Sequence, residues 1–233
     1  MDDIKKNKYF LLIKLNQIKF ITLNNKNQII LNKEILINNL TENDNFEILE
    51  NFLDQNIIEI EKKLQSYVKD IYLIVDNNDF LTIDMSSIKN FKNYLNQTNY
   101  ISNLLVDLKN NLKKDMINYK IIHLLINKFI IGGKNYSSLP QGLQKENVFL
   151  EIRFICMKNI IYLKFKKIFS KYEITIKNIL NYKYINNFKK SEKENIFVIA
   201  NRVIDGFNRN EVLFVNKASK NKGFFEKFFD FFS

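Results

Sequence analysis

The spacing of the apolar runs near the start of the chain constrains its fold more than any other feature of the sequence. Three runs rich in β-branched and aromatic residues follow one another at residues 8–15, 18–24 and 28–35. Only two or three residues separate consecutive runs, which is enough for a hairpin turn and too few for a helix. These runs therefore predict an antiparallel meander.

A helix and then a buried strand follow the meander. Apolar residues recur at steps of three and four through residues 45–66, which predicts an amphipathic helix. Residues 70–77 (DIYLIVDN) have a continuous apolar centre, as in a strand that is covered on both faces. A helix between a meander and such a strand is predicted to lie across one face of the sheet.

The second half of the chain alternates between helix and strand signals without an internal repeat. Residues 120–140 predict two short strands that lead through Gly132 and Gly133 to an irregular loop. Ser191 and Glu194 have capping-box spacing and are predicted to open the last of these helices. Helices are predicted for residues 98–114, 159–170 and 192–206, and strands for residues 148–156, 173–180 and 211–216.

The C-terminal stretch contains six phenylalanines among the last ten residues. On a helix at about 100° per residue, these rings fall within an arc of roughly 160° and the polar residues occupy the rest. Lysines lie just upstream, which is typical of a helix in a membrane interface. The alternative is a terminal helix packed on the protein's own core. The predicted membrane-binding residues are Lys220, Lys222, Phe224, Phe225, Lys227, Phe228, Phe229, Phe231 and Phe232.

The net charge of +11 raises the question of a nucleic-acid partner. Lysine and asparagine are in excess throughout the chain, and no Arg-rich arm, zinc-ligand pattern or aromatic RNA-binding motif accompanies the charge. We therefore expect no nucleic-acid partner, and keep a soluble basic nucleic-acid-binding protein as the alternative. The N-terminus lacks a signal peptide and no stretch has transmembrane length, so we expect a cytoplasmic location or attachment from the cytoplasmic side.

The residues that could carry chemistry are few. His123 is the only histidine and lies in the apolar run IIHLLI, which favours a hydrogen-bonded strand histidine over a general base. Cys156 is the only cysteine, which excludes an intramolecular disulfide, and the alternation around it predicts a buried strand position.

Two further motifs are candidate ligand sites. Asp76, Asp79 and Asp84 form the densest carboxylate cluster, for which a solvated strand end is favoured over a magnesium site. Gly132 and Gly133 lack the flanking residues of a phosphate loop, so a hairpin bend explains them. The sequence therefore predicts no catalytic, cofactor-binding or metal-binding residue, and a protein that is not an enzyme.

The order of elements in residues 121–180 matches a known family. Ile122-His123-Leu124 matches the family's first strand in this region, Gly142-Leu143 a glycine-leucine turn, and residues 152–156 a further strand. On these residues the chain resembles FtsA, the actin-related membrane anchor of the bacterial cell-division ring. Residues 9–75 are also similar to the start of an actin-type lobe, and the tail is similar to the family's membrane-targeting helix.

The chain departs from this family in the parts that bind nucleotide. Actin-type ATPases carry Asp-x-Gly-Ser/Thr at the end of the first strand, whereas this chain has Leu15-Asn16-Gln17 there and no glycine. The family's proline after the first strand of residues 121–180 is replaced near Ile126-Asn127, and the second lobe is missing. These departures predict no nucleotide cofactor, with an ATPase remnant that still binds nucleotide as the alternative.

The implied fold class is α+β, a half-actin-like lobe with an inserted small α+β subdomain and a C-terminal amphipathic helix. The first-lobe portion is residues 1–84, and the inserted interaction subdomain is residues 85–180. Residues 181–216 return to the first lobe as a helix and a strand, and residues 217–233 form the basic linker and the membrane-targeting helix.

The resemblance implies a non-catalytic, membrane-tethered adaptor of bacterial cell division at the inner face of the cytoplasmic membrane. Its partners would be the anionic membrane surface, other cell-division proteins and a second copy of itself. In the family the tubulin-like ring protein docks on the second lobe, so residues 85–180 are the better-supported interaction surface.

Overall fold

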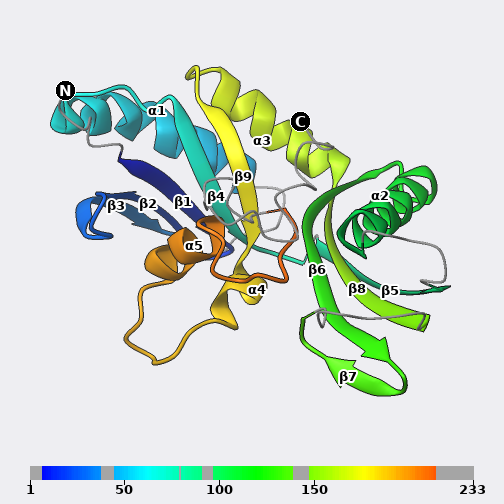
Figure 1. The fold of residues 1–233 in the computed structure, drawn as a ribbon. Helices are drawn as coiled ribbons and strands as arrows, with labels where there is room; N and C mark the ends of the chain where they lie inside the picture. Colours follow the sequence, from blue (N-terminus) through cyan, green and yellow to red (C-terminus); the bar gives the residue numbers. More distant parts are fainter. Residues whose placement is uncertain (1–6, 38–44, 79, 91–96, 139–146, 214–233) are drawn as a thin grey trace. The chain divides into compact units, whose positions relative to one another are not determined.

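The computed structural model describes residues 7–37, 45–78, 80–90, 97–138 and 147–213. By contacts between Cα atoms the chain divides into two compact units. Unit 1 is Met1–Phe80 with Lys158–Asn201, and unit 2 is Leu81–Met157 with Arg202–Ser233. Each unit is therefore assembled from two separate stretches of the chain, as the colours of Figure 1 show.

Unit 1 is built on a mixed five-stranded sheet with the order β3-β2-β1-β4-β9 (Figure 1). The strands are β1 (Lys8–Lys14), β2 (Gln17–Leu23), β3 (Ile29–Leu36), β4 (Asp70–Asp76) and β9 (Thr175–Asn181). The antiparallel pairs β1–β2 and β2–β3 form the predicted meander, which is confirmed. The parallel pairs β1–β4 and β4–β9 extend it, so that β4 is paired on both edges and its centre is buried.

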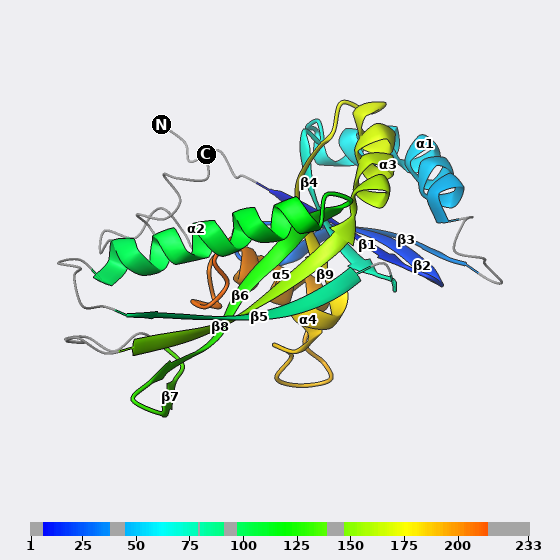
Figure 2. The same ribbon diagram turned by 90° about the vertical axis from the view of Figure 1, so that its right-hand side faces the viewer.

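Helices lie on both faces of this sheet (Figures 1 and 2). On one face, α1 (Asn45–Leu64) and α3 (Asn159–Ser170) meet through Phe46 and Phe165, whose ring centroids are 5.1 Å apart. On the other, α5 (Ile196–Ile204) places Phe197 against Phe10 of β1 at 6.3 Å, and the short α4 (Tyr182–Asn186) follows β9. The predicted helices at residues 45–66 and 159–170 are confirmed.

The start of α5 differs from the prediction. The sequence predicts a helix from residue 192 with a capping box at Ser191 and Glu194. Instead the helix begins at Ile196, and the Asn195 side chain accepts the N–H of Phe197 at 2.9 Å. The Glu194 carboxylate accepts the N–H of Lys190 at 2.8 Å and so closes a turn before the helix. The capping-box prediction is wrong because a nearer asparagine caps the helix.

Unit 2 contains a four-stranded sheet with the order β5-β8-β6-β7 and one long helix (Figure 2). Its elements are β5 (Phe80–Asn90), α2 (Gln97–Asp115), β6 (Tyr119–Ile131), β7 (Lys134–Tyr136) and β8 (Asn147–Lys158). The predicted helix at residues 98–114 and the strand at residues 148–156 are confirmed. The two short strands expected in residues 120–140 are instead one long strand and a three-residue return, and β5 has no counterpart among the predicted strands.

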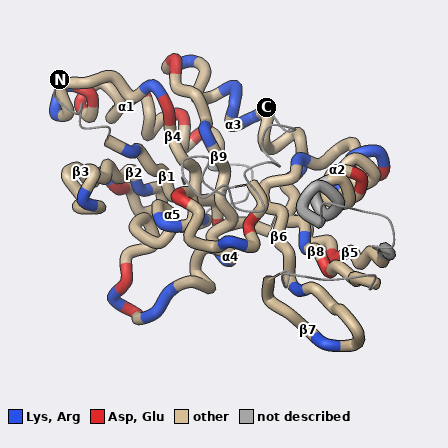
Figure 3. The backbone as a smooth tube through the Cα atoms, viewed as in Figure 1, with Lys and Arg blue, Asp and Glu red and all other residues tan. Residues whose placement is uncertain are grey.

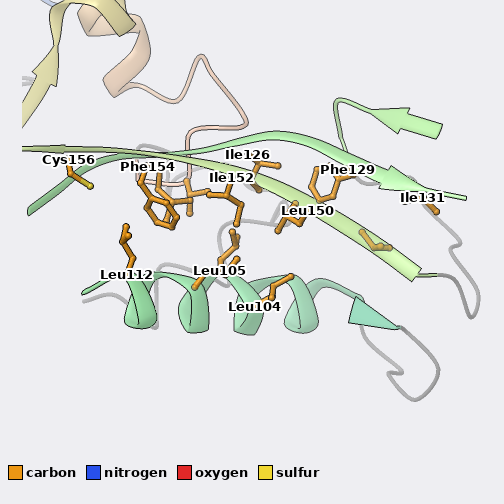
Figure 4. Packing of buried hydrophobic residues seen from close by; sticks show 14 residues of the cluster. Leu104, Leu105, Leu112, Ile126, Phe129, Ile131, Leu150, Ile152, Phe154 and Cys156 are labelled. Carbon is orange, nitrogen blue, oxygen red and sulfur yellow. The ribbon is translucent and has the colours of Figure 1, made fainter. Parts of the chain in front are cut away.

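The core of unit 2 lies between α2 and the sheet (Figure 4). Four leucines of α2 at three- and four-residue spacing face the inward residues of β6 and β8. These leucines are Leu104, Leu105, Leu108 and Leu112. Val212, from the second stretch of unit 2, is fully buried in the same cluster. Residues far apart in the sequence therefore complete one core.

The two sheets and the helices on them confirm the predicted α+β class. The domain ranges from the sequence stay a prediction, and the contact-based units differ from them. The predicted subdomain includes residues 159–180, whereas α3 packs on α1 and β9 pairs with β4 of the first sheet. The parallel β4–β9 ladder explains this placement, because it joins strands about a hundred residues apart.

Candidate functional site

The residues predicted to bind a membrane lie outside the described residues. Lys220, Lys222, Lys227 and the six phenylalanines of the tail all belong to residues 214–233. Their role therefore stays a prediction. Within the described part of the chain, no helix is both long enough and apolar enough to cross a bilayer.

The last described segment is fastened along the edge of β6. The N–H of Ile126 donates to the carbonyl of Asn210, and the N–H of Val212 donates to the carbonyl of Leu124, both at 2.9 Å. Leu125 and Glu211 form an antiparallel β-bridge between these two hydrogen bonds. The strand predicted for residues 211–216 is thus reduced, among the described residues, to this single bridge.

A buried pair of ionisable side chains reinforces the bridge. Glu211 and His123 are both fully buried, and a Glu211 carboxylate oxygen lies 3.1 Å from His123 Nδ1. The other carboxylate oxygen accepts the N–H of Leu124 at 3.1 Å and that of Leu213 at 3.4 Å. We call Glu211, its three partners and the β-bridge the Glu211 clasp.

The Glu211 clasp explains the only histidine of the chain. A buried carboxylate is costly unless hydrogen bonds and an opposite charge compensate for its lost hydration, and the Glu211 clasp supplies hydrogen bonds to both oxygens. A general base must also reach its substrate, and the His123 side chain has no exposed surface. The interpretation of His123 as a hydrogen-bonded strand residue is confirmed, whereas no local pattern in the sequence identifies Glu211 as its partner.

Two carboxylates of the candidate magnesium site contact cationic side chains of the protein. The Arg153 guanidinium makes two contacts with Asp84, at 2.7 and 2.8 Å, and these hold the pKa of Asp84 below its usual range. Asp76 lies 3.5 Å from the Lys14 ammonium, and Asp79 is outside the described residues. No group of three potential metal ligands occurs in the parts of the chain that the structure describes.

The two turns considered for phosphate binding are both hairpin turns. Gly132 and Gly133 have φ of 54° and 76° and join β6 to β7. Positive φ at both positions is the requirement of a tight two-residue hairpin, so the predicted hairpin bend is confirmed. Leu15 and Asn16 join β1 to β2, and the Asn16 carbonyl accepts the N–H of Ile37 at 2.9 Å.

Cys156 lies in the interior of unit 2. It is fully buried on β8 among the residues that face α2 (Figure 4). Burial disfavours the thiolate and raises the pKa of this thiol to about 11. The predicted buried strand position is therefore confirmed, and the thiol stays protonated at neutral pH.

Comparison with solved structures yields distant matches. No protein-family model and no curated protein matches the chain. The cytoplasmic domain of EpsL, an inner membrane component of the type II secretion system of Vibrio cholerae, is 9% identical with a TM-score of 0.39. The PilM–PilN type IV pilus biogenesis complex is 8% identical with a TM-score of 0.46. A Bacteroides thetaiotaomicron protein with an actin-like ATPase fold and unknown function is 14% identical with a TM-score of 0.33.

These matches cover 80%, 80% and 81% of this chain. In return the chain spans 61%, 50% and 58% of the three structures. Because the TM-scores are below 0.5 and the identities are low, these similarities do not indicate a function. The α+β fold is therefore described by the chain's own mixed and antiparallel strand pairings. The finer likeness to FtsA finds no specific support in these three structures.

Proposed function

We propose that this chain is a non-catalytic adaptor tethered peripherally to the cytoplasmic side of the cell membrane, similar in role to FtsA, and that it holds cell-division proteins there. The observation that carries the proposal is the pattern of the last ten residues, with six phenylalanines on one arc of a helix. Rings in the acyl boundary and lysines beside anionic headgroups together supply the binding energy of such a tether.

The Glu211 clasp supports a tether at this end of the chain. It fastens residues 210–212 to β6 through backbone and buried side-chain hydrogen bonds. The segment that carries the phenylalanines begins soon after Leu213, so it is joined to a firmly held point of unit 2.

The candidate catalytic side chains contact other side chains of the protein, and this supports an adaptor over an enzyme. His123 contacts Glu211 in the interior, and Asp84 and Asp76 form ion pairs with Arg153 and Lys14. The turn after β1 also carries no glycine that would let its backbone amides approach a phosphate. We therefore assign no catalytic residue, cofactor or metal to the chain.

We assign the binding of division proteins, and of a second copy of the chain, to the surface of unit 2. The tubulin-like ring protein is a further candidate. Two of the distantly similar structures come from other assemblies, a type II secretion system and a type IV pilus biogenesis complex. Crosslinking the full chain in its own cells and identifying the captured proteins decides between a division partner and a partner of those other kinds.

Vesicle sedimentation tests the tether. A fully buried phenylalanine ring contributes up to about 2 kcal/mol, and each lysine near an anionic surface contributes about 1 kcal/mol. Partial ring burial and the ordering of the helix reduce this sum, so we expect reversible binding that weakens with salt. Phe228→Glu should release the protein from anionic vesicles, whereas the matched change Glu226→Lys on the polar arc should leave binding intact or tighten it.

A melting curve of each variant separates the tether from a tail packed on the core. Core packing predicts little vesicle binding by the parent and a lower melting temperature for Phe228→Glu. A parent that stays in the supernatant with anionic vesicles at low salt would refute the proposed function.

A further inference from the structure

The outward side of α3 combines exposed apolar residues with lysines. Its inward side is anchored in unit 1 by Phe165, Ile168 and Phe169, which are all buried. On the opposite side, the side chains of Ile160 and Leu163 are 62% and 57% exposed. At a spacing of three residues, these two aliphatic side chains are neighbours on the surface of the helix.

Lysines flank these two aliphatic residues. At about 100° per residue, Lys164 and Lys167 share an outward arc of roughly 100° with Ile160 and Leu163. Both lysines are exposed, as is Lys166 beside the arc. The helix sequence NIIYLKFKKIFS contains no acidic residue, and Figure 3 shows basic residues along α3. We call Ile160, Leu163, Lys164, Lys166 and Lys167 the α3 face.

Two acidic residues of α1 contact the residues that directly follow α3. Glu50 forms an ion pair with Lys171, beyond the end of α3. The Asp54 carboxylate accepts the hydroxyl of Tyr172 at 2.6 Å. The Lys164 ammonium lies 5.1 Å from the centre of the Phe46 ring, which contributes no opposing charge. Within the described residues, these two carboxylates are therefore engaged away from the lysines of the α3 face.

We propose that the α3 face is a second membrane contact, which lies on an anionic lipid surface while the tail inserts. This inference rests on the proposed tether, because the tail brings the chain to the bilayer. An anionic bilayer matches both halves of the surface. Lysine ammonium groups meet the headgroups, while the two aliphatic side chains enter the acyl boundary.

The α3 face adds to the affinity of the tail without replacing it. Each lysine near an anionic surface is worth about fivefold in partitioning, and the effect is screened by salt. Two partly inserted aliphatic side chains are too few to hold the protein alone. A glutamate in place of Leu163 removes one of these side chains and sets a negative charge against the headgroups. We expect about a tenfold or greater loss of partitioning.

The experiment uses the full chain and phosphatidylcholine vesicles with phosphatidylglycerol. Sedimentation compares the parent with Leu163→Glu, Lys167→Gln and Phe228→Glu. Ile117→Glu is the control, because this isoleucine of unit 2 is 74% exposed and the change in charge is the same. A melting curve confirms folding for each variant. We expect Leu163→Glu to weaken binding about tenfold, Lys167→Gln a few-fold, and Ile117→Glu not at all.

The outcomes separate this inference from the proposed function. If Phe228→Glu releases the protein while Leu163→Glu and Lys167→Gln bind like the parent, the tail tether is supported. The lipid contact of the α3 face is then refuted. If Leu163→Glu and Ile117→Glu lose equal affinity, only net charge matters and the α3 face is again refuted. If Phe228→Glu still binds and Leu163→Glu does not, the tail tether is refuted, and so is the α3 face as an addition to the tail. A parent that does not bind refutes both.

Two further results complete the test of the α3 face. If Leu163→Glu fails to fold, Lys167→Gln decides, because it leaves the apolar residues in place. If Leu163→Glu abolishes self-association in sedimentation velocity while vesicle binding is unchanged, the α3 face contacts a second copy of the chain. That result also refutes the lipid contact.

Discussion

Replacing Glu211 by alanine removes the centre of the Glu211 clasp. The carboxylate accepts the N–H of Leu124 and contacts His123, and all of these groups are buried. Each buried polar group that loses a partner costs about 1–3 kcal/mol, and Glu211→Ala takes this partner from both the Leu124 N–H and His123 Nδ1. We therefore expect Glu211→Ala to lower the free energy of unfolding of unit 2 by about 3–5 kcal/mol.

A graded series of variants makes this expectation specific. Glu211→Gln keeps the shape and one acceptor oxygen for the Leu124 N–H, so it should cost only about 1–2 kcal/mol. Glu34→Ala removes a carboxylate that pairs with Lys19 at 2.6 Å on the exposed surface of unit 1, and should cost less than about 1 kcal/mol. The order of the three decreases in the free energy of unfolding shows whether burial of the pair, rather than removal of a carboxylate as such, determines the cost.

Amide hydrogen exchange reports on unit 2 without assuming that both units unfold together. The Leu124 N–H donates to Glu211 and the Val212 N–H donates to the Leu124 carbonyl, so both should lose protection in Glu211→Ala. A loss of about 3–5 kcal/mol corresponds to about two to nearly four orders of magnitude in exchange rate. If Glu211→Ala costs less than about 1 kcal/mol, or no more than Glu211→Gln, the burial of the pair does not have the energetic role assigned to it.

Three further predictions concern single sites. Burial raises the pKa of Cys156 to about 11, so the folded protein should not react with a thiol reagent at about pH 8 and should react fully in denaturant. Rapid labelling of the native protein would contradict the burial of this thiol. Asp84→Asn should remove a small acid-dependent part of the stability, below about 1 kcal/mol for this exposed pair. The pKa of Asp84 is lowered in the folded protein, so the pair stabilises the fold at pH values above the ordinary carboxyl range. This contribution is lost as the pH falls through the lowered pKa. Urea titrations of both proteins at several acidic pH values measure the contribution. Because the turn at Leu15 and Asn16 has no glycine, calorimetry on protein without residues 217–233 should detect no binding of ATP with magnesium, and micromolar affinity would overturn the half-actin interpretation.

The parts of the fold that can be predicted from the sequence are those set by local signals. The meander of β1 to β3 follows from short gaps between apolar runs, and α1 from its three- and four-residue steps. The strand β5 is not among the predicted strands, although Leu81, Ile83 and Met85 alternate with polar residues. Its period of two is the signal that identifies it as a strand.

The pairing of distant segments could not be predicted. His123 and Glu211 are 88 positions apart, and a glutamate at the start of an apolar run is typical of a solvated strand end. Only the bridge to β6 makes Glu211 an interior residue. Likewise β9 is predicted as a strand by its own residues, whereas its place beside β4 depends on the tertiary structure.

The pairing of β4 with β9 has a consequence for synthesis on the ribosome. The second edge of β4 has no partner until β9 has been translated, and roughly a hundred residues lie between them, which takes about 5–20 s at ordinary elongation rates. During this interval the nascent chain presents the unpaired edge of an apolar strand, which is a template for association with other chains. Most of unit 2 emerges in the same interval, and its core is completed only when Val212 follows. Nascent chains stalled before β9 should therefore be more prone to aggregation than those stalled after it.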